Sequence, residues 1–281
     1  MVGKKLPIYA VVYYFFLLIA TVVTAIPLIW MISGSFDRIQ SFELPYPPRF
    51  FPANPSLFNY QMVLINLRIV QFMTNTIIVA FFGTIGQLIV ASLAGFAFSK
   101  GQFPFKAIML IIIMSNLMVP IETRLLPLFM ITRDLGLVNT HTGIILPGLL
   151  TNAFFIFLMK KFCDDLPYDL YESAVLDGAP KFRIYAQIYL PLMGPALATL
   201  AVLEVMNLWN DLLWPMIVTN RIEMATLQVG LAMFSSGTDA IQHHAGMVSA
   251  ASIMSILPLA VVFCCLQKYI VQSIAVSGMK Q

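Results

Sequence analysis

The sequence has 281 residues, of which 59% are hydrophobic and only 10% are charged, and its formal net charge is +3. Soluble domains carry about 25% charged residues, so this composition predicts an integral membrane protein. The small net charge and the lack of basic runs longer than two residues give no indication of nucleic-acid binding, and none is predicted. Cysteines at positions 163, 264 and 265 are too few and too irregularly spaced for a disulfide framework or a zinc site.

A helix needs about 20 predominantly apolar residues to cross a bilayer, and the chain offers six candidate spans. They lie near residues 8–32, 72–98, 107–122, 141–159, 191–217 and 246–267. The first follows Lys4 and Lys5 and so resembles a signal peptide, but its apolar run of about 25 residues exceeds the roughly 7–15 of such a peptide. It is therefore predicted to be a retained membrane anchor. Pro120 and Glu122 interrupt the outer end of the third candidate.

The basic residues predict the orientation of these spans. With the N-terminus inside, all nine lysines and Arg183 fall on the cytoplasmic side, whereas the other six arginines fall outside or near the outer ends. We therefore predict an all-α integral membrane protein with six transmembrane helices and both termini in the cytoplasm. No linker rich in glycine and serine divides the chain, so residues 1–281 are expected to form one membrane domain.

Residues 164–190 form a polar segment between the fourth and fifth spans, on the predicted cytoplasmic side. Asp165 can cap a short helix that has Pro167 in its first turn. Gly178 fits the left-handed conformation that ends such a helix, and Pro180 can open the next one. The segment is therefore predicted to be a short helix, a sharp turn and a second helix, held close to the membrane.

The short helix has the features of a docking element. Ala174 and Gly178, four residues apart, would leave one side narrow enough for another surface to approach. Tyr171, Val175 and Leu176 would supply apolar side chains beside it. Such an element is typical of insertion into a groove on a partner protein, although composition alone is equally compatible with an ordinary loop helix.

Glu204 is an ionisable residue near the middle of the fifth span, where a charge costs on the order of 3 kcal/mol on insertion scales. Two interpretations stay open. The residue is either an ion-coupling site, as in a gradient-driven secondary transporter, or a paired or protonated group in a subunit interface, which is the preferred interpretation.

Sequence signatures of catalysis are absent. The chain contains no Gly-x-x-x-x-Gly-Lys-[Ser/Thr] phosphate loop, no His-Glu-x-x-His and no Gly-x-Ser-x-Gly. The adjacent His243 and His244 are expected to be solvated rather than bound to a metal. The chain is therefore predicted to be no enzyme and to hold no catalytic residue, metal or cofactor of its own.

Four separated elements of the polar segment resemble the "EAA" loop of ABC importer permeases. They are Glu172-Ser173-Ala174, Gly178 after three residues, and Ile188-Tyr189-Leu190-Pro191 after nine more. The family pattern reads Glu-Ala-Ala, three residues, Gly, nine residues, Ile-x-Leu-Pro, so only Ser173 departs from it. The resemblance implies that this loop docks into ATP-hydrolysing subunits and couples them to the membrane helices. The residues assigned to coupling are Glu172, Ser173, Ala174, Asp177, Gly178, Ile188, Leu190 and Pro191.

Further resemblances narrow the branch to carbohydrate importers. Residues 207–220 and 135–147 are similar to segments of sugar permeases that lie in the fifth span and before the fourth. The C-terminal "SIAVSGMKQ" is similar to the tail of the second permease subunit of the maltose type, although the Gly-x-x-Lys-Gly ending of that tail is only partly kept. A contact between the tail and the ATPases therefore stays open.

The resemblance implies one half of a heterodimeric, alternating-access pathway in a bacterial inner membrane. Its partners would be a second homologous permease subunit, two ATP-binding cassette subunits that bind ATP with Mg, an extracytoplasmic solute-binding protein and membrane lipid. The substrate would be a sugar or oligosaccharide. An ion-gradient transporter using Glu204 is the alternative, and a membrane-embedded enzyme is disfavoured by the missing motifs.

Sugar sites combine aromatic faces with amide and carboxylate hydrogen bonds, and the end of the fifth span offers both. Asn207, Asn210 and Asp211 would share one face of a helix. The alternative is that an aromatic-rich helix end belongs to the interfacial belt of the membrane. The candidate pathway residues are Glu204, Asn207, Trp209, Asn210, Asp211 and Trp214.

Overall fold

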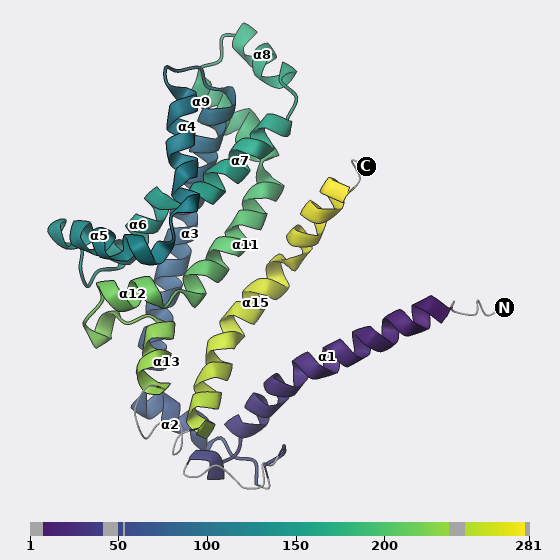
Figure 1. The fold of residues 1–281 in the computed structure, drawn as a ribbon, viewed down its shortest axis with the longest axis vertical. Helices are drawn as coiled ribbons and strands as arrows, with labels where there is room; N and C mark the ends of the chain where they lie inside the picture. The colour runs from purple at the N-terminus through teal and green to yellow at the C-terminus, as the bar shows by residue number, and fades with distance from the viewer. Residues whose placement is uncertain (1–7, 42–49, 53, 236–244, 279–281) are drawn as a thin grey trace. The chain divides into compact units, whose positions relative to one another are not determined.

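The computed structural model describes residues 8–41, 50–52, 54–235 and 245–278, and apart from an isolated bridge between Asp37 and Pro55 these residues form no strand. The fold is all-α, as predicted (Figure 1). Its elements are α1 (Ile8–Ser35), η1 (Ile39–Ser41), α2 (Phe58–Asn66), α3 (Ile69–Lys100), α4 (Lys106–Ser115), η2 (Asn116–Met118), α5 (Ile121–Asp134), α6 (His141–Thr151), α7 (Ala153–Asp165), α8 (Asp169–Leu176), α9 (Lys181–Ile184), η3 (Tyr185–Tyr189), α10 (Leu190–Leu192), α11 (Gly194–Asn210), α12 (Leu213–Val218), η4 (Ile222–Met224), α13 (Leu227–Ser235) and α15 (Ala245–Gly278).

Contacts within the chain divide it into two compact units. Unit 1 comprises Met1–Ile69 and Leu231–Leu257, and unit 2 comprises Val70–Gly230 and Pro258–Gln281. The single membrane domain expected over residues 1–281 stays a prediction. The coupling segment and the candidate pathway residues all belong to unit 2.

Three helices are long and apolar enough to cross a membrane, and three bent pairs of helices bring the number to six if each pair is one span. The bend of 111° in the first pair coincides with the interruption that Pro120 and Glu122 make in the third candidate span. The continuous helices are Val12–Ser35, Ile69–Lys100 and Ala245–Cys264. The bent pairs are Lys106–Met118 with Ile121–Asp134 (111°), His141–Thr151 with Ala153–Asp165 (48°), and Lys181–Leu192 with Gly194–Asn210 (75°).

The first two breaks are linked by side chains. The amide nitrogen of Asn116 donates to the carbonyl of Thr151 at 2.6 Å, and Nη1 of Arg124 donates to Oδ1 of Asn116 at 2.5 Å. A broken helix leaves backbone groups unpaired, and hydrocarbon offers them no partner. Asn116 therefore satisfies a carbonyl that the bend between α6 and α7 has freed.

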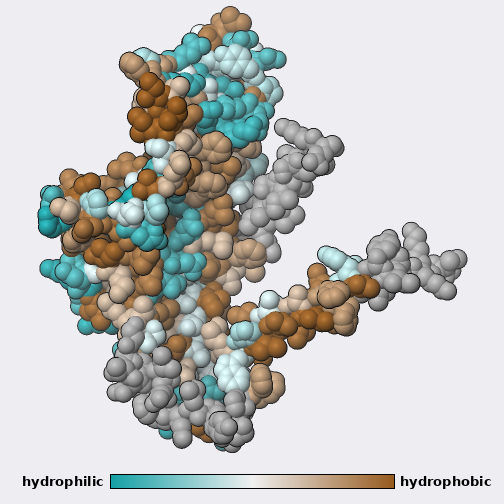
Figure 2. Space-filling model, viewed as in Figure 1, coloured by the Kyte–Doolittle hydropathy of each residue, from teal (hydrophilic) through white to brown (hydrophobic). Residues whose placement is uncertain are grey.

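The apolar surface of α1 faces outward along its whole membrane-spanning length. None of its most apolar 18-residue window is buried, whereas 39% of the corresponding window of α3 is buried (Figure 2). An exposed apolar surface of this extent needs lipid or another protein to cover it. The arrangement fits a helix whose side chains are solvated by the bilayer.

The main core of unit 2 joins α3, α7 and η3. Phe96 of α3 packs between Tyr185 and Tyr189, with ring centroids 5.6 and 5.0 Å apart. Gly95 lets α7 approach α3 closely, because a Cβ there would lie only 2.6 Å from Cβ of Met159. This core carries the coupling segment on its surface.

Unit 1 contains a small polar centre at the end of α1. Nδ2 of Asn59 donates to the carbonyls of Ser35 and Asp37, both at 3.0 Å. The start of α15 presses against this amide, since a Cβ on Gly246 would lie 2.6 Å from Nδ2 of Asn59. A buried asparagine thus fixes the turn that follows α1.

Candidate functional site

The predicted cap of the coupling helix is wrong. Asp165 is the last residue of α7, where Oδ1 accepts a hydrogen bond from Nζ of Lys161 at 3.0 Å. The α8 helix begins only at Asp169 and has no side-chain cap. Pro167 holds Leu166 extended between the two helices, so Asp165 lies too far from the first turn of α8 to cap it.

The end of α8 agrees with the prediction. Gly178 has φ +76°, and its N–H donates to the carbonyl of Val175 at 3.0 Å. The N–H of Ala179 donates to the carbonyl of Ala174, also at 3.0 Å. This pair of bonds is a Schellman turn, which needs a left-handed residue and therefore favours glycine. Pro180 then precedes α9.

The two faces of α8 are distributed differently from the prediction. Ala174 is buried in the core of unit 2, and Tyr171 turns inward, with its ring centroid 6.4 Å from that of Phe96. The sequence predicted that both residues would be open to a partner surface, but Ala174 is buried and Tyr171 is partly buried against α3. Leu176, at 87% exposure, and Val175 do point outward. Glu172, Ser173 and Asp177 are exposed beside them.

The second half of the motif is an anchor in the core. Ile188 and Leu190 pack against the buried cluster that contains Tyr189. Residues Tyr185–Tyr189 form a π-helix just before Pro191. Proline lacks the N–H for the bond one turn back, and its ring crowds the carbonyl there, which accounts for the wider turn.

Lys100, which sequence reasoning used only for orientation, fastens α8 to α3. Its side chain is buried, Nζ lies 5.3 Å from the centroid of the Tyr168 ring and 5.7 Å from that of Tyr189, and it donates to the carbonyl of Leu166 at 3.5 Å. Cation–π contacts of this kind are stronger away from water. The feature of the sequence that could have predicted this role is the position of Lys100 as a single lysine at the end of an apolar span.

Glu204 is enclosed by its own chain. It is only 5% exposed, and the side chain of Asn207, one turn later on α11, hydrogen-bonds to it. Glu204 thus has its hydrogen-bonding partner, Asn207, within unit 2. A second subunit is not needed to pair it. Asn207 itself is exposed.

The predicted helical face of Asn207, Asn210 and Asp211 does not form. The α11 helix ends at Asn210, and Asp211 is extended. Oδ1 of Asp211 accepts a hydrogen bond from the backbone N–H of Trp214 at 3.4 Å, at the start of α12. Asn210 remains exposed, with Nδ2 donating to the carbonyl of Met206 at 2.8 Å.

Both tryptophans of this segment are buried. Trp214 packs with Val79 and Val218, and its indole N–H donates to the carbonyl of Gly143 at 3.1 Å. Trp209 is 4% exposed. Their faces are therefore covered by the chain, and of the six candidate pathway residues only Asn207 and Asn210 are classed as exposed.

The two sequence segments that resemble sugar permeases meet in space. Asn139, in a left-handed conformation with φ +60°, accepts hydrogen bonds at Oδ1 from the backbone N–H groups of Asn220 and Arg221, at 2.8 and 3.1 Å. Thr140 caps α6, and Nδ2 of Asn75 donates to the carbonyls of Glu223 and Ala225. We call Asn75, Asn139, Thr140 and the 219–225 loop the polar network. Sequence reasoning missed Asn139, although asparagine tolerates this backbone conformation better than most residues.

Among the residues that the structure describes, no three His, Cys, Asp or Glu side chains gather as a metal site would require. His243 and His244 lie outside the described residues.

The fold is all-α, with several apolar helices that can span a membrane. The exposed helix α8, which ends in a Schellman turn, lies beside the lysine-bearing ends of these helices. These features are typical of a transport permease. Residues 90–276 match the family described as binding-protein-dependent transport system inner membrane component, and the chain belongs to that family.

The most similar relatives include permeases for several substrates. The chain is 34% identical over 206 residues to an arabinooligosaccharides transport system permease protein of Bacillus subtilis strain 168, covering 73% of this chain and 72% of that protein. It is 29% identical over 279 residues to an sn-glycerol-3-phosphate transport system permease protein of Rhizobium meliloti strain 1021, covering 96% and 98%. It is 30% identical over 272 residues to a lactose transport system permease protein of Rhizobium radiobacter, covering 96% and 95%.

A solved structure agrees with these relatives. A chain from the crystal structure of a bacterial ABC transporter involved in the import of the acidic polysaccharide alginate matches with a TM-score of 0.81 at 28% identity, covering 93% of this chain and 96% of that one. The prediction of a multi-pass, inner-membrane ABC importer permease is therefore confirmed, in preference to an ion-gradient transporter.

Proposed function

We propose that this permease imports a sugar or oligosaccharide and forms half of a heterodimeric pathway with a second, homologous permease subunit. An extracytoplasmic solute-binding protein delivers the substrate, and two ATPase subunits bind ATP with Mg. The relatives support the carbohydrate class, because arabinooligosaccharides, lactose and alginate appear among the substrates in their names. The sn-glycerol-3-phosphate permeases show that the family also has other substrates.

The exposed side of α8 is the observation that supports a contact with the ATPase subunits. Leu176 projects an apolar side chain into solvent, and Glu172 and Asp177 flank it with negative charge. A large, isolated apolar side chain on a short helix is suited to a pocket on a partner. We assign this side of α8 to contact with the ATPase.

The buried side of α8 gives the contact a mechanical route inward. Tyr171 and Ala174 rest on the core that includes Phe96 of α3, and α9 leads directly through η3 and α10 into α11. Close-packed cores transmit displacement because they deform little. Movement of α8 on ATPase closure is thereby passed to two spanning elements.

The test is co-purification of the tagged chain with its ATPase from mild detergent. Leu176→Glu should lose the ATPase while leaving the permease folded, because the side chain is 87% exposed and contributes little to the fold of this chain. Leu135→Glu is the matched control, since that leucine is 62% exposed in the turn after α5 and should retain the ATPase.

If Leu176→Glu retains the ATPase, the assignment of α8 to the ATPase contact is wrong. A wild-type chain that purifies alone, stable and without ATPase, would overturn the importer complex itself. The substrate class is tested separately, by uptake of labelled neutral and acidic oligosaccharides in cells that express the whole system.

A further inference from the structure

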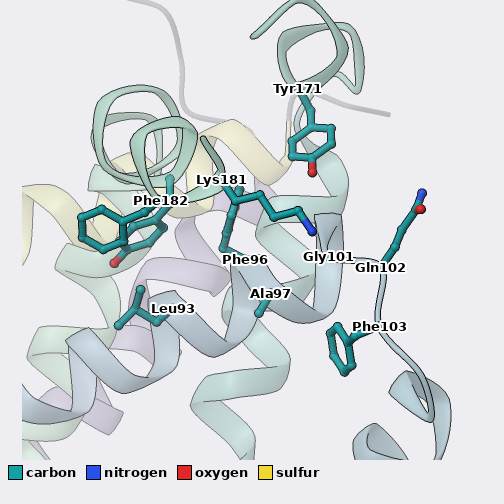
Figure 3. Close-up of a pocket in the computed structure, with 10 residues that line it drawn as sticks. Leu93, Phe96, Ala97, Gly101, Gln102, Phe103, Tyr171, Lys181 and Phe182 are labelled. Carbon is teal, nitrogen blue, oxygen red and sulfur yellow. The ribbon is translucent and has the colours of Figure 1, made fainter. Parts of the chain in front are cut away.

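A pocket of about 320 Å³ lies between the end of α3, the turn that follows it, α8 and α9. Figure 3 shows its walls: Leu93, Phe96 and Ala97 from α3, Phe103 from the turn, Tyr171 from α8 and Phe182 from α9. These walls are apolar and aromatic, so the pocket favours a hydrocarbon or aromatic occupant over a hydrated one.

A cation stands at one end of the pocket. The side chain of Lys181 extends from α9 toward Gly101 (Figure 3). Within the described part of the chain its ammonium has no hydrogen bond or ion pair, and no acidic residue lines the pocket. Lys106 lies beside the same turn, where Nζ donates to the carbonyls of Ser99 and Gly101 and keeps its third N–H. The lining of the pocket therefore carries a positive charge and no negative one.

The other end of the pocket opens onto an apolar stripe. Leu93 and Ala97 lie one turn apart on α3, and Ile85 and Ile89 continue the same face toward the middle of the helix. All four side chains are exposed in this chain. The stripe follows a spanning helix, so a chain of methylene groups could lie along it from the membrane surface toward the bilayer centre.

We propose that this pocket binds one anionic phospholipid, with the phosphate on Lys181 and one acyl chain along Ala97, Leu93 and Ile89. A cation at headgroup depth above an apolar groove matches the build of a phospholipid. The lysines lie at the same ends of the helices, which the distribution of basic residues places on the cytoplasmic side. The occupant would belong to the inner leaflet.

The bound lipid would touch both parts of the coupling segment. Tyr171 belongs to the inward side of α8, and Phe182 follows Lys181 on α9. A lipid in the pocket would fill the space between α8 and α3. A displacement of α8 would then be passed to α3 instead of being taken up by closing the pocket. Anionic lipid is therefore expected to raise the fraction of ATP hydrolysis that is coupled to transport.

Native mass spectrometry of the full-length permease in its complex, with phosphatidylglycerol or phosphatidylcholine added, tests the site. One phosphatidylglycerol should be retained in preference to phosphatidylcholine. Lys181→Gln should weaken that retention about fivefold, as expected for one lysine near a charged lipid surface, and Lys181→Arg should preserve it. Ala97→Trp, which fills the groove from an exposed position, should abolish the retained lipid.

Lys161→Gln is the control, because that lysine is exposed and paired with Asp165 away from the pocket. Equal retention of the two lipids, or equal loss in Lys181→Gln and Lys161→Gln, overturns the proposal. So does full retention in Ala97→Trp. Lipid retention is measured without transport, so its failure leaves the proposed import function untouched.

Discussion

Two helices of unit 2, α5 and α8, each end in a turn of the same type, but the surroundings of the two turns differ. Gly178 ends α8 and Gly136 ends α5, both with positive φ and with the hydrogen bonds of a Schellman turn. Before Gly178, the side chains of Leu176, Glu172 and Asp177 are exposed. Beyond Gly136, the chain enters the polar network, where Asn139 and Thr140 bind backbone groups.

The difference separates a surface that the chain leaves uncovered from a structure that is closed on itself. In the coupling segment, apolar side chains point outward and the chain leaves them uncovered. Between Glu204 and Trp214, the groups that looked available for ligands are engaged within the chain. Glu204 pairs with Asn207, Asp211 accepts from the N–H of Trp214, and the indole of Trp214 donates to the carbonyl of Gly143. Identical local geometry therefore says little about function, and the surroundings decide it.

The sharpest way to break this comparison is to substitute the two glycines. Gly178→Trp should abolish transport, because a bulky side chain would stand in the proposed contact with the ATPase. Gly136→Trp should retain most transport. A Cβ added at either glycine would meet nothing within 4 Å, and each substitution carries the same left-handed penalty of about 1–2 kcal/mol. Transport in proteoliposomes measures the difference, and equal loss in both variants would falsify the docking role.

Trp214 tests whether the segment after α11 is structural. Trp214→Ala should lower the stability of the solubilised permease by about 3–5 kcal/mol because it removes a buried indole. Trp214→Phe should lower it by about 1–3 kcal/mol, since the carbonyl of Gly143 loses its donor. Thermal unfolding reports both changes. If neither variant loses stability but substrate affinity falls, the indole contacts substrate instead.

Glu204 tests the same segment for ion coupling. Glu204→Gln should transport close to the wild-type rate, because the amide keeps a hydrogen-bonding side chain opposite Asn207. Glu204→Leu should be less stable, since it leaves the amide of Asn207 without that partner. Loss of transport in Glu204→Gln with intact stimulation of the ATPase would contradict this expectation and revive a gradient-driven step.

Ser173→Ala should have the smallest effect. The serine hydroxyl donates to the carbonyl of Asp169 at 2.7 Å, one turn back, and is otherwise exposed. Alanine restores the family pattern and raises helix propensity by about 0.5 kcal/mol. Transport should be unchanged, and α8 should exchange its amide hydrogens slightly more slowly. A loss of transport would mean that the hydroxyl itself meets the partner.

The features that the sequence predicted well depend on local chemistry. Gly178 was predictable because few other residues adopt a left-handed helix end, and the long apolar spans because their length has few alternatives. The inward orientation of Tyr171 and Ala174 on α8 was not predictable. It depends on Phe96, which lies 75 residues earlier than Tyr171 in the chain. Burial of Trp214 likewise depends on a carbonyl in α6.

The bends were unpredictable for a related reason. Prolines occur both within continuous helices, as Pro27 in α1 and Pro258 in α15, and at breaks, as Pro120 before α5. A proline inside a helix removes a backbone hydrogen bond, whereas one at the start of a helix removes none, so a proline alone does not mark a break. Whether a helix breaks also depends on neighbours that pair with the freed groups, as Asn116 does by donating to the carbonyl of Thr151 at the α6–α7 break.

The linked breaks constrain how the protein is made. The α4 and α6 helices have 10 and 11 residues, about 15 Å each, which is half of a bilayer core of about 30 Å. The α6–α7 pair does not satisfy the carbonyl of Thr151 until the side chain of Asn116, from the earlier pair, lies beside it. We therefore expect the translocon to release residues 141–165 into lipid only where residues 106–134 already lie beside them.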